Sequence, residues 1–444
     1  MWDNIQLVTA VLSLSAFTAA TGIGAWRRHL RMREHFIRKD AEQGNKSIVI
    51  NELNRYGVDA SKLTPNEQLA ALEAAIQTRY KRLTYSIYAA LTVGVASATG
   101  SFAQYRNVAP AGQWQLPSDY IVWFGTNRRP LIEGNPEAGF SGLLDGKTHY
   151  GTCTVHIPKA HRFGSVGSGW KHRLLTLTDD RLKLTEISPL DESSFWRSVK
   201  TELARWEKAD EKQALVYIHG FNVSFQEAAI RAAQVGFDLK ALGATAFFSW
   251  PSRGQTEEYK ADEASIEASE AAITEFLVRF AETFGTARVH IIAHSMGNRG
   301  LLRAMQRIQT DAQRQTSVRF GQIILAAPDV GTALFTNLAG AYLNLSTRTT
   351  IYASPSDKAV GLSQWIHKAP RAGFTPPVVV VQGLDTVEVP NFDLDALGHS
   401  YYAEAEAVLS DIYTLLRSNR SPDDRQRLQT TRLANGERYW LILP

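Results

Sequence analysis

One short segment in the second half of the chain limits the folds open to it more than any other. An apolar, β-branched run at residues 289–293 leads into Ser295, and apolar side chains at helical spacing follow at residues 298–308. Small residues, Ala293 and Gly297, stand two positions before and two positions after the serine. Strand, tight turn and helix around such a serine form the pattern of a nucleophile elbow, in which a sharp turn leaves no room for bulky neighbours. We therefore expect Ser295 to lie at the top of a sheet.

Strand-like and helix-like runs alternate on both sides of this segment. Apolar runs without polar alternation are typical of strands covered on both faces, and amphipathic runs of helical period separate them. The predicted strands are residues 120–126, 150–157, 173–186, 214–218, 244–250, 289–293, 322–326, 349–352 and 378–381. The predicted helices begin after residue 191 and at 225–242, 259–284, 298–308 and 401–416. The alternation predicts an α/β fold with a mostly parallel, doubly wound sheet and helices on both faces.

Polar residues follow several of the predicted strands, where an open α/β sheet binds its ligands. A serine hydroxyl is a poor nucleophile unless a base, usually a histidine held by a carboxylate, removes its proton. The chain order Ser295, Asp357, His399 is the order of nucleophile, acid and base in α/β-hydrolases. Asp329 and Asp385 also follow predicted strands and remain alternatives for the acid.

A reaction at this serine also needs donors for the oxyanion that develops on the attacked carbonyl group. One candidate is the backbone N–H of Met296, directly after the serine. The other is the backbone N–H of Phe221, in the loop that follows the strand at 214–218. Gly220 lets this loop approach a substrate closely, and His219 is expected to support the loop rather than to transfer protons.

Composition excludes several other kinds of site. The formal net charge is only +4, too small to indicate a nucleic-acid partner. The single cysteine, Cys153, excludes an intrachain disulfide and has no Cys or His partners at metal-ligand spacing. We expect Cys153 to be a packing residue, and no metal or organic cofactor is implied.

Two uncharged apolar segments, residues 5–26 and 83–103, each reach the roughly 20 residues that span a bilayer. Residues 27–82 between them carry twelve Lys or Arg against seven acidic residues, which predicts a cytoplasmic loop by the positive-inside rule. The pair then predicts an N-terminal transmembrane hairpin in a bacterial inner membrane, with the large domain in the periplasm. A signal peptide, for the first segment, or two buried core helices are the alternatives.

This interpretation divides the chain into four parts. They are a membrane hairpin with a basic loop at residues 1–103, a linker at 104–117, an α/β domain at 118–420 and a polar tail at 421–444. The tail contains a hairpin signal, since Asn435-Gly436 separates two strand-like runs.

Several short motifs occur in a fixed order along the α/β domain. They are residues 217–222 (YIHGFN), 248–252 (FSWPS), 293–298 (AHSMGN), 327–329 (APD) and 398–402 (GHSYY), preceded by 124–128 (FGTNR) and 150–152 (YGT). Together they resemble a bacterial family of lipase- or esterase-like α/β-hydrolases that is catalogued as a domain of unknown function. The resemblance covers about residues 120–418 and implies a serine hydrolase with Ser295 as nucleophile and His399 as base. It does not supply a substrate.

The sequence thus predicts a membrane-anchored serine hydrolase that cleaves carboxylic esters through Ser295, His399 and Asp357 and an acyl-enzyme intermediate. The expected substrate is a small-molecule or lipid ester, such as an acylated envelope component. The same triad would serve an amidase, a thioesterase or an acyltransferase, and a non-catalytic scaffold of the same fold is an alternative of another class. The sequence leaves the oligomeric state open.

Overall fold

The computed structural model describes the second part of the chain almost continuously. The described residues are 118–167, 180–208, 211–254, 258–390 and 405–443, with isolated positions between 50 and 84. The chain divides into two compact units, Met1–Trp114 and Gln115–Pro444. Within the described ranges, no helix has both the length and the apolar character that crossing a bilayer requires. Apart from Thr84, the two predicted spans at residues 5–26 and 83–103 lie outside the described residues.

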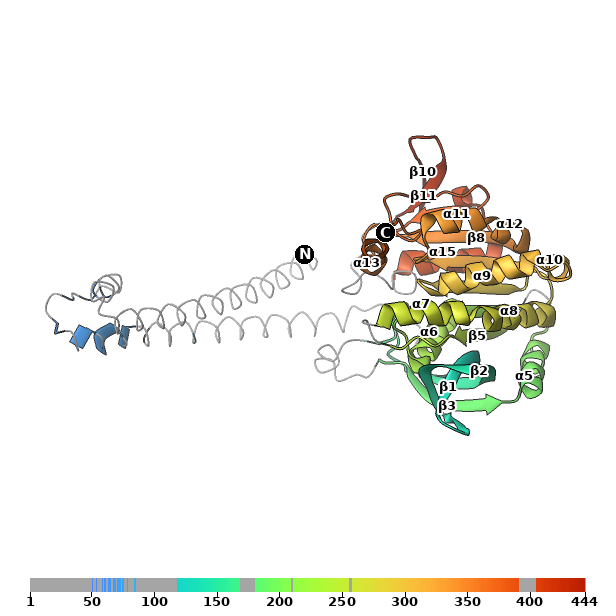
Figure 1. Ribbon diagram of the computed structural model, residues 1–444, viewed down its shortest axis with the longest axis horizontal. Coiled ribbons are helices and arrows are strands. Elements are labelled where there is room, and N and C mark those ends of the chain that lie inside the picture. The colour runs from blue at the N-terminus through green and yellow to red at the C-terminus, as the bar shows by residue number, and fades with distance from the viewer. Residues whose placement is uncertain are drawn as a thin grey trace, which may run out of the picture. The chain divides into compact units, whose positions relative to one another are not determined.

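One 11-stranded sheet organises the described part of the second unit, in the order β10-β11-β9-β8-β7-β6-β4-β5-β1-β2-β3 (Figure 1). The strands are β1 (Ser118–Ile132), β2 (Asn135–Ile157), β3 (Lys183–Leu190), β4 (Ala214–Ile218), β5 (Ala244–Ser249), β6 (Val289–His294), β7 (Phe320–Ala326), β8 (Ser346–Ala353), β9 (Asp385–Glu388), β10 (Leu428–Arg432) and β11 (Arg438–Ile442). Along this order, every neighbouring pair between β11 and β1 is parallel. The pairs β1–β2, β2–β3 and β10–β11, at the two ends of the sheet, are antiparallel. The predicted mostly parallel sheet is confirmed.

Helices cover both faces of this sheet (Figure 1). One face carries α5 (Glu192–Ala204), α8 (Glu270–Phe284), α9 (Gly297–Thr310), α11 (Thr332–Leu338) and α12 (Gly340–Leu345), and the other carries α6 (Phe225–Asp238) and α15 (Glu406–Ser418). The remaining helices are α7 (Tyr259–Ala268), α10 (Arg314–Ser317), α13 (Lys358–His367) and the short 3-10 turn η3 (Pro422–Asp424).

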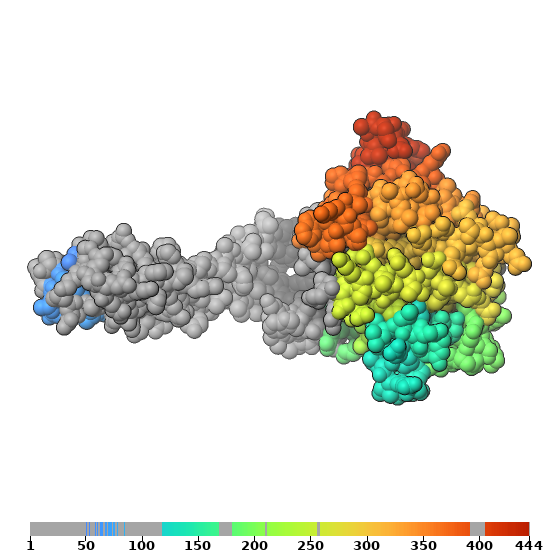
Figure 2. Space-filling view, viewed as in Figure 1, coloured from blue at the N-terminus to red at the C-terminus, as the bar shows by residue number. Residues whose placement is uncertain are grey.

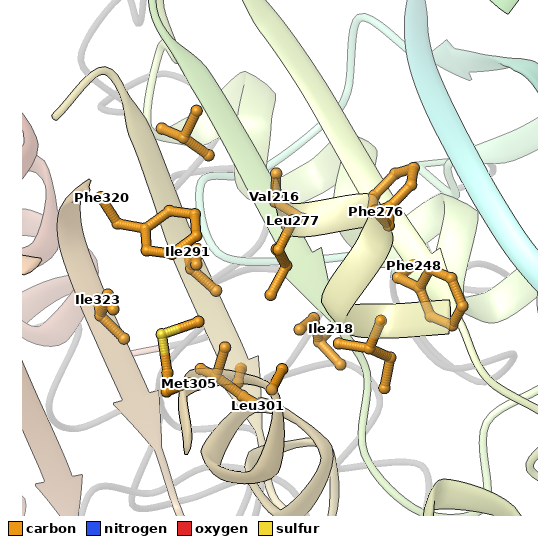
Figure 3. Close-up of a cluster of buried hydrophobic side chains, with 14 of the residues drawn as sticks. Val216, Ile218, Phe248, Phe276, Leu277, Ile291, Leu301, Met305, Phe320 and Ile323 are labelled. Carbon is orange, nitrogen blue, oxygen red and sulfur yellow. The ribbon is translucent and has the colours of Figure 1, made fainter. Parts of the chain in front are cut away.

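Each central strand contributes side chains to both hydrophobic layers. On β4, Val216 and Ile218 join the cluster under α8 and α9, while Leu215 and Tyr217 join the cluster under α6. Figure 3 shows the first of these clusters, where Leu301 of α9 lies among side chains of the sheet. Because both faces of β4 are covered, its sequence is apolar without alternation.

The structure corrects two of the predicted elements. The predicted helix at residues 259–284 is divided into α7 and α8 at Ser269, whose hydroxyl donates to the Ser265 carbonyl and competes with the helical hydrogen bonds. The predicted strand at residues 378–381 is wrong. It directly follows two prolines, which lack the N–H groups that a sheet needs. The paired segment is β9 instead, so Asp385 begins a strand rather than following one.

The C-terminal hairpin forms as predicted and is part of the sheet. Strands β10 and β11 pair through Thr430 and Trp440, and β11 pairs in parallel with β9 through Trp440 and Val387. Trp440 is nearly buried, and the hairpin lies at one end of the second unit, in red in Figure 2.

A buried histidine at the start of β6 predicts a pH-dependent stability. The Nδ1 atom of His290 accepts the Gln322 N–H at 2.9 Å, and burial lowers its pKa from 6.5 to about 4. Because the unfolded chain binds this proton first, the stabilisation is complete above pH 6.5 and is lost as the pH falls toward 4, by up to ~3 kcal/mol. In urea titrations, the wild type should therefore lose more unfolding free energy over this range than His290→Gln. Parallel losses in both proteins would contradict the assignment.

Candidate active site

The chain makes a strained turn between β6 and α9, at Ser295. Strand β6 ends at His294, α9 begins at Gly297, and Ser295 between them has φ +51°, a left-handed backbone that is uncommon for a residue with a Cβ. The Ser295 N–H donates to the Ala326 carbonyl of β7 at 2.9 Å. The Ser295 carbonyl accepts the N–H of Asp329 at 3.2 Å. Backbone strain of this kind persists where neighbouring structure enforces it, and it is concentrated at functional sites.

The turn is possible because its neighbours are small. A methyl group at Gly297 would lie 2.5 Å from the His219 carbonyl oxygen and 2.9 Å from that of Ile218. A methyl group at Gly220 would lie 2.9 Å from the Cβ of Ser295. The two glycines therefore let the loop after β4 lie directly against the serine, as the elbow pattern predicts.

Asn298 fixes the turn from inside α9, a role that we did not predict. Its Nδ2 atom donates to the carbonyl groups of Ala293 and Ser295, each at 3.0 Å, and lies 3.2 Å from that of Ala326. Only 1% of Asn298 is exposed. The signal in the sequence was a polar residue in the first turn of a helix whose inner face is otherwise apolar.

The two N–H groups predicted to bind an oxyanion are both without an acceptor among the described residues. Within the part of the chain that the structure describes, neither the Phe221 N–H nor the Met296 N–H donates a hydrogen bond. Met296 lies in the turn itself, and Phe221 follows Gly220, where the space beside Ser295 is too small for a Cβ. Unpaired backbone donors next to a strained serine can bind an oxygen that gains negative charge.

His219 supports this loop and is not placed for proton transfer to a substrate. The residue is fully buried, its ring stacks on Trp250 at 5.0 Å between centroids, and its carbonyl accepts the Trp250 indole N–H at 2.8 Å. Its Nδ1 lies 2.8 Å from the Gly220 carbonyl oxygen, and its Nε2 faces the guanidinium of Arg128. Burial and the charge of Arg128 hold the pKa of His219 well below its ordinary value, so the ring is neutral.

Asp357 lies beyond the carboxyl end of β8 and caps α13. One of its oxygens accepts the Val360 N–H at 2.9 Å, and the residue is completely buried. A buried carboxylate at this edge is in the region where the acid of a triad is expected. His399, the predicted base, lies outside the described residues.

Asp329 follows β7, as predicted, but both of its carboxylate oxygens are engaged. One accepts the Ser363 hydroxyl at 2.6 Å and the other accepts the Tyr259 hydroxyl. Arg299 and Arg371 lie 3.6 and 3.5 Å from the two oxygens. The network ties Asp329 to α7 and α13.

Asp385 occupies the opposite end of its strand. It begins β9 and forms ion pairs with Arg348 at 2.9 Å and with Arg425 at 3.4 Å. Since Ser295 follows the carboxyl end of β6, Asp385 does not share its edge of the sheet. This corrects the reason for which Asp385 was a candidate.

A cavity of about 480 Å³ opens beside the loop after β4. Its described lining includes Tyr217, Asn222, Val223, Ile230 and His294. His294 directly precedes the serine, and the volume is in the range of small-molecule sites. Within the described residues, no group of three or more His, Cys, Asp or Glu could hold a metal ion.

Gly297 and Gly340 provide a matched test of the close approach at the turn. Gly297→Ala should lower the unfolding free energy by about 1–3 kcal/mol, because its methyl group meets backbone oxygens that cannot move independently. Gly340→Ala, at the start of α12 with no atom within 4 Å, should change it by less than about 1 kcal/mol. Urea denaturation measures both, and equal effects would contradict the geometry.

Comparisons with known proteins agree with the motifs. A family model described as alpha/beta hydrolase of unknown function (DUF900) matches residues 196–420, half of the chain. A crystal structure of a predicted CIB-like hydrolase from Thermoplasma acidophilum is similar at 17% identity, covering 48% of this chain and 89% of that chain with a TM-score of 0.30. No curated protein matches the chain. The chain belongs to this family of α/β-hydrolases of unknown function.

Proposed function

We propose that this chain is a serine hydrolase that cleaves carboxylic esters, with Ser295 as nucleophile, His399 as base and Asp357 as the acid that orients it. The observation that carries the proposal is the left-handed backbone of Ser295 between β6 and α9. In a turn with only a structural role, a serine with a left-handed backbone would add strain without benefit. A nucleophile, in contrast, needs this backbone, because it holds the hydroxyl group clear of the sheet.

The proposed reaction begins with attack of the Ser295 Oγ on the ester carbonyl carbon. His399 takes the hydroxyl proton, and the carbonyl oxygen becomes an oxyanion that accepts the N–H groups of Phe221 and Met296. The tetrahedral intermediate then expels the alcohol, whose oxygen takes the proton from the imidazolium. Water, activated by the same histidine, hydrolyses the acyl-enzyme and releases the acid.

A lipid ester or an acylated envelope component is the substrate class that we propose. The cavity beside Asn222 and His294 has a mixed lining, in which Tyr217, Val223 and Ile230 are apolar and Arg181, Glu227 and Arg231 are charged, and this suits an ester with both an acyl chain and a polar group. The same triad would also serve amides, thioesters or acyl transfer, so a panel of short-chain substrates must compare these classes.

We also propose that residues 5–26 and 83–103 anchor the domain in the bacterial inner membrane, with the hydrolase unit in the periplasm. The support is the sequence alone, namely two uncharged segments on either side of a basic loop. Such an anchor would hold Ser295 close to lipid substrates.

Three variants test the triad in the full chain. Ser295→Ala should abolish both hydrolysis of a short-chain aryl ester and labelling by a fluorophosphonate probe, because the attacking oxygen is gone. Asp357→Asn should lower kcat by about 10²- to 10⁴-fold, because the histidine loses its orienting carboxylate. Asp385→Asn, at the other end of its strand, is the matched control and should keep kcat within about threefold.

Three results would overturn all or part of the assignment. Unchanged hydrolysis by Ser295→Ala would exclude the nucleophile, and absence of labelling in the folded wild type would favour the non-catalytic scaffold. A loss of kcat in Asp329→Asn but not in Asp357→Asn would move the acid to the carboxylate after β7.

Topology can be tested independently of activity. Reporter fusions after Arg55 should report the cytoplasm, and fusions after Asn107 should report the periplasm, because the basic loop stays inside. Cytoplasmic signals from both positions would exclude the hairpin.

A further inference from the structure

We propose that Arg128 is a positioning residue of the active site, whose buried guanidinium holds the loop at residues 219–223 so that the Phe221 N–H faces the oxyanion. The inference rests on the proposed serine-hydrolase function, because it concerns the donor that this function uses. Arg128 lies near the end of the pairing between β1 and β5, far in sequence from both the loop and the serine.

Every nitrogen of the Arg128 side chain has a partner, and the partners come from three separate segments. Only 1% of the residue is exposed. Its Nε donates to the Ser249 hydroxyl at 2.8 Å, and its Nη1 donates to the carbonyl groups of Ser252 at 2.8 Å and of Ser141 at 3.2 Å. Its Nη2 donates to the Val223 carbonyl at 2.7 Å. The planar fork therefore joins β2 and the ends of β4 and β5.

The same guanidinium determines which nitrogen of His219 carries the proton. Nη2 of Arg128 lies 3.3 Å from His219 Nε2, and an arginine nitrogen can only donate. His219 Nε2 is therefore the acceptor, and Nδ1 carries the hydrogen that is donated to the Gly220 carbonyl at 2.8 Å. Arg128 thus contacts the loop twice, at Val223 directly and at Gly220 through His219.

An aspartate fixes the other side of the loop. Asp262 of α7 accepts the Ser252 hydroxyl at 2.5 Å, and the same oxygen lies 3.5 Å from the Asn222 nitrogen. The Ser252 hydroxyl oxygen in turn accepts the Val223 N–H at 3.1 Å. The N–H groups of residues 222 and 223 and the carbonyl group of Val223 are consequently held, with Arg128 and Asp262 as the two charged ends of the network.

Burying the Arg128 guanidinium costs free energy, because its charge is removed from water. No carboxylate among the described residues forms an ion pair with Arg128, and burial lowers its pKa to about 9. Removing this guanidinium alone would leave the carbonyl groups that it binds without their donor, so the experiment must measure a loss of stability separately from a loss of rate. What an apolar side chain could not supply is the fixed fork that sets the position of the Val223 carbonyl.

The exact position of the loop at residues 219–223 is important because its backbone is closely confined. Asn222 adopts φ +57°, and a Cβ at Gly220 would lie 2.9 Å from the Cβ of Ser295 and 2.9 Å from the Nδ1 of His294. An oxyanion donor must lie 2.7–3.1 Å from the developing charge, so a displacement of a few tenths of an ångström weakens it. The loss falls on the transition state and not on substrate binding.

Arg128→Lys and Arg128→Met test the inference, with Arg425→Met as matched control. Arg425 is equally buried but binds Asp411 and Asp385 at the other end of the sheet. We measure kcat and KM for a short-chain aryl ester, and the inhibition constant of an alkylboronic acid, which forms a tetrahedral adduct with a serine. Thermal melting reports stability in each variant.

The expected pattern separates positioning from stability. Arg128→Lys should lower kcat about 10- to 100-fold and Arg128→Met about 100- to 1000-fold, with KM unchanged within about threefold. The boronate constant should rise by the factor by which kcat/KM falls. Arg425→Met should lower the melting temperature but leave kcat within about threefold.

Several results would overturn the inference. Wild-type kcat in a folded Arg128→Met, or a rise in KM at constant kcat, would show that the guanidinium does not position the donor. Where Arg128→Met does not fold, Arg128→Lys and Ser252→Ala carry the test, and wild-type kcat in both would exclude the role. A wild type that is not labelled at Ser295 would instead refute the proposed function and the inference with it.

Discussion

Two glycine contacts, one on each side of Ser295, are the constraint on which the rest of the site depends. Gly297 brings the start of α9 against the carbonyl groups at the end of β4, and Gly220 brings the following loop against the serine itself. Each contact leaves no space for a methyl group. Because both approaches occur together, the turn after β6 and the loop after β4 are fixed against each other, and two N–H groups that have no acceptor among the described residues lie in these segments.

The parallel sheet supplies the framework for this unit. Strands β4, β6 and β7 lie side by side in register, so that their carboxyl ends bring His219, Ser295 and Asp329 to one edge. Their apolar side chains fill clusters on both faces and keep the strands at fixed positions (Figure 3). The edge then carries polar networks that a packed core could not hold, including the Asn298 amide and the Arg128 guanidinium.

The sequence pattern predicted those elements that depend on interactions between residues close together in the chain. The strand at Val289–His294, the tight turn and the helix after it are readable because apolar periodicity and small residues act over a few positions. The Asn435-Gly436 hairpin was predicted for the same reason, whereas the addition of β11 to the sheet depends on a distant partner, β9. Ser269 and Pro377 show where prediction from local pattern fails. The Ser269 side chain competes for a helical carbonyl and divides a predicted helix. Pro377 lacks an N–H and directly precedes the predicted strand that does not form.

Only those residues of the candidate site that belong to short motifs, or that follow the expected chain order, could be predicted from the sequence. Ser295, Phe221 and Met296 belong to short motifs, and the structure places Gly220, the neighbour of Phe221, close to Ser295. Arg128 ends the FGTNR motif at residues 124–128, but the motif gave it no role in the site, because its partner Val223 lies 95 positions away and arginines are mostly exposed. Asp385 failed for the converse reason, since its role as a candidate depended on a strand that lies elsewhere.

A crystal structure of the full chain after reaction with a fluorophosphonate tests the central claim most directly. The account predicts a phosphorus atom bonded to the Ser295 Oγ, with its phosphoryl oxygen about 3 Å from the nitrogens of Phe221 and Met296. It also predicts that His399 contacts Asp357. A folded protein without an adduct at Ser295, or an adduct whose phosphoryl oxygen lies away from both N–H groups, would contradict it.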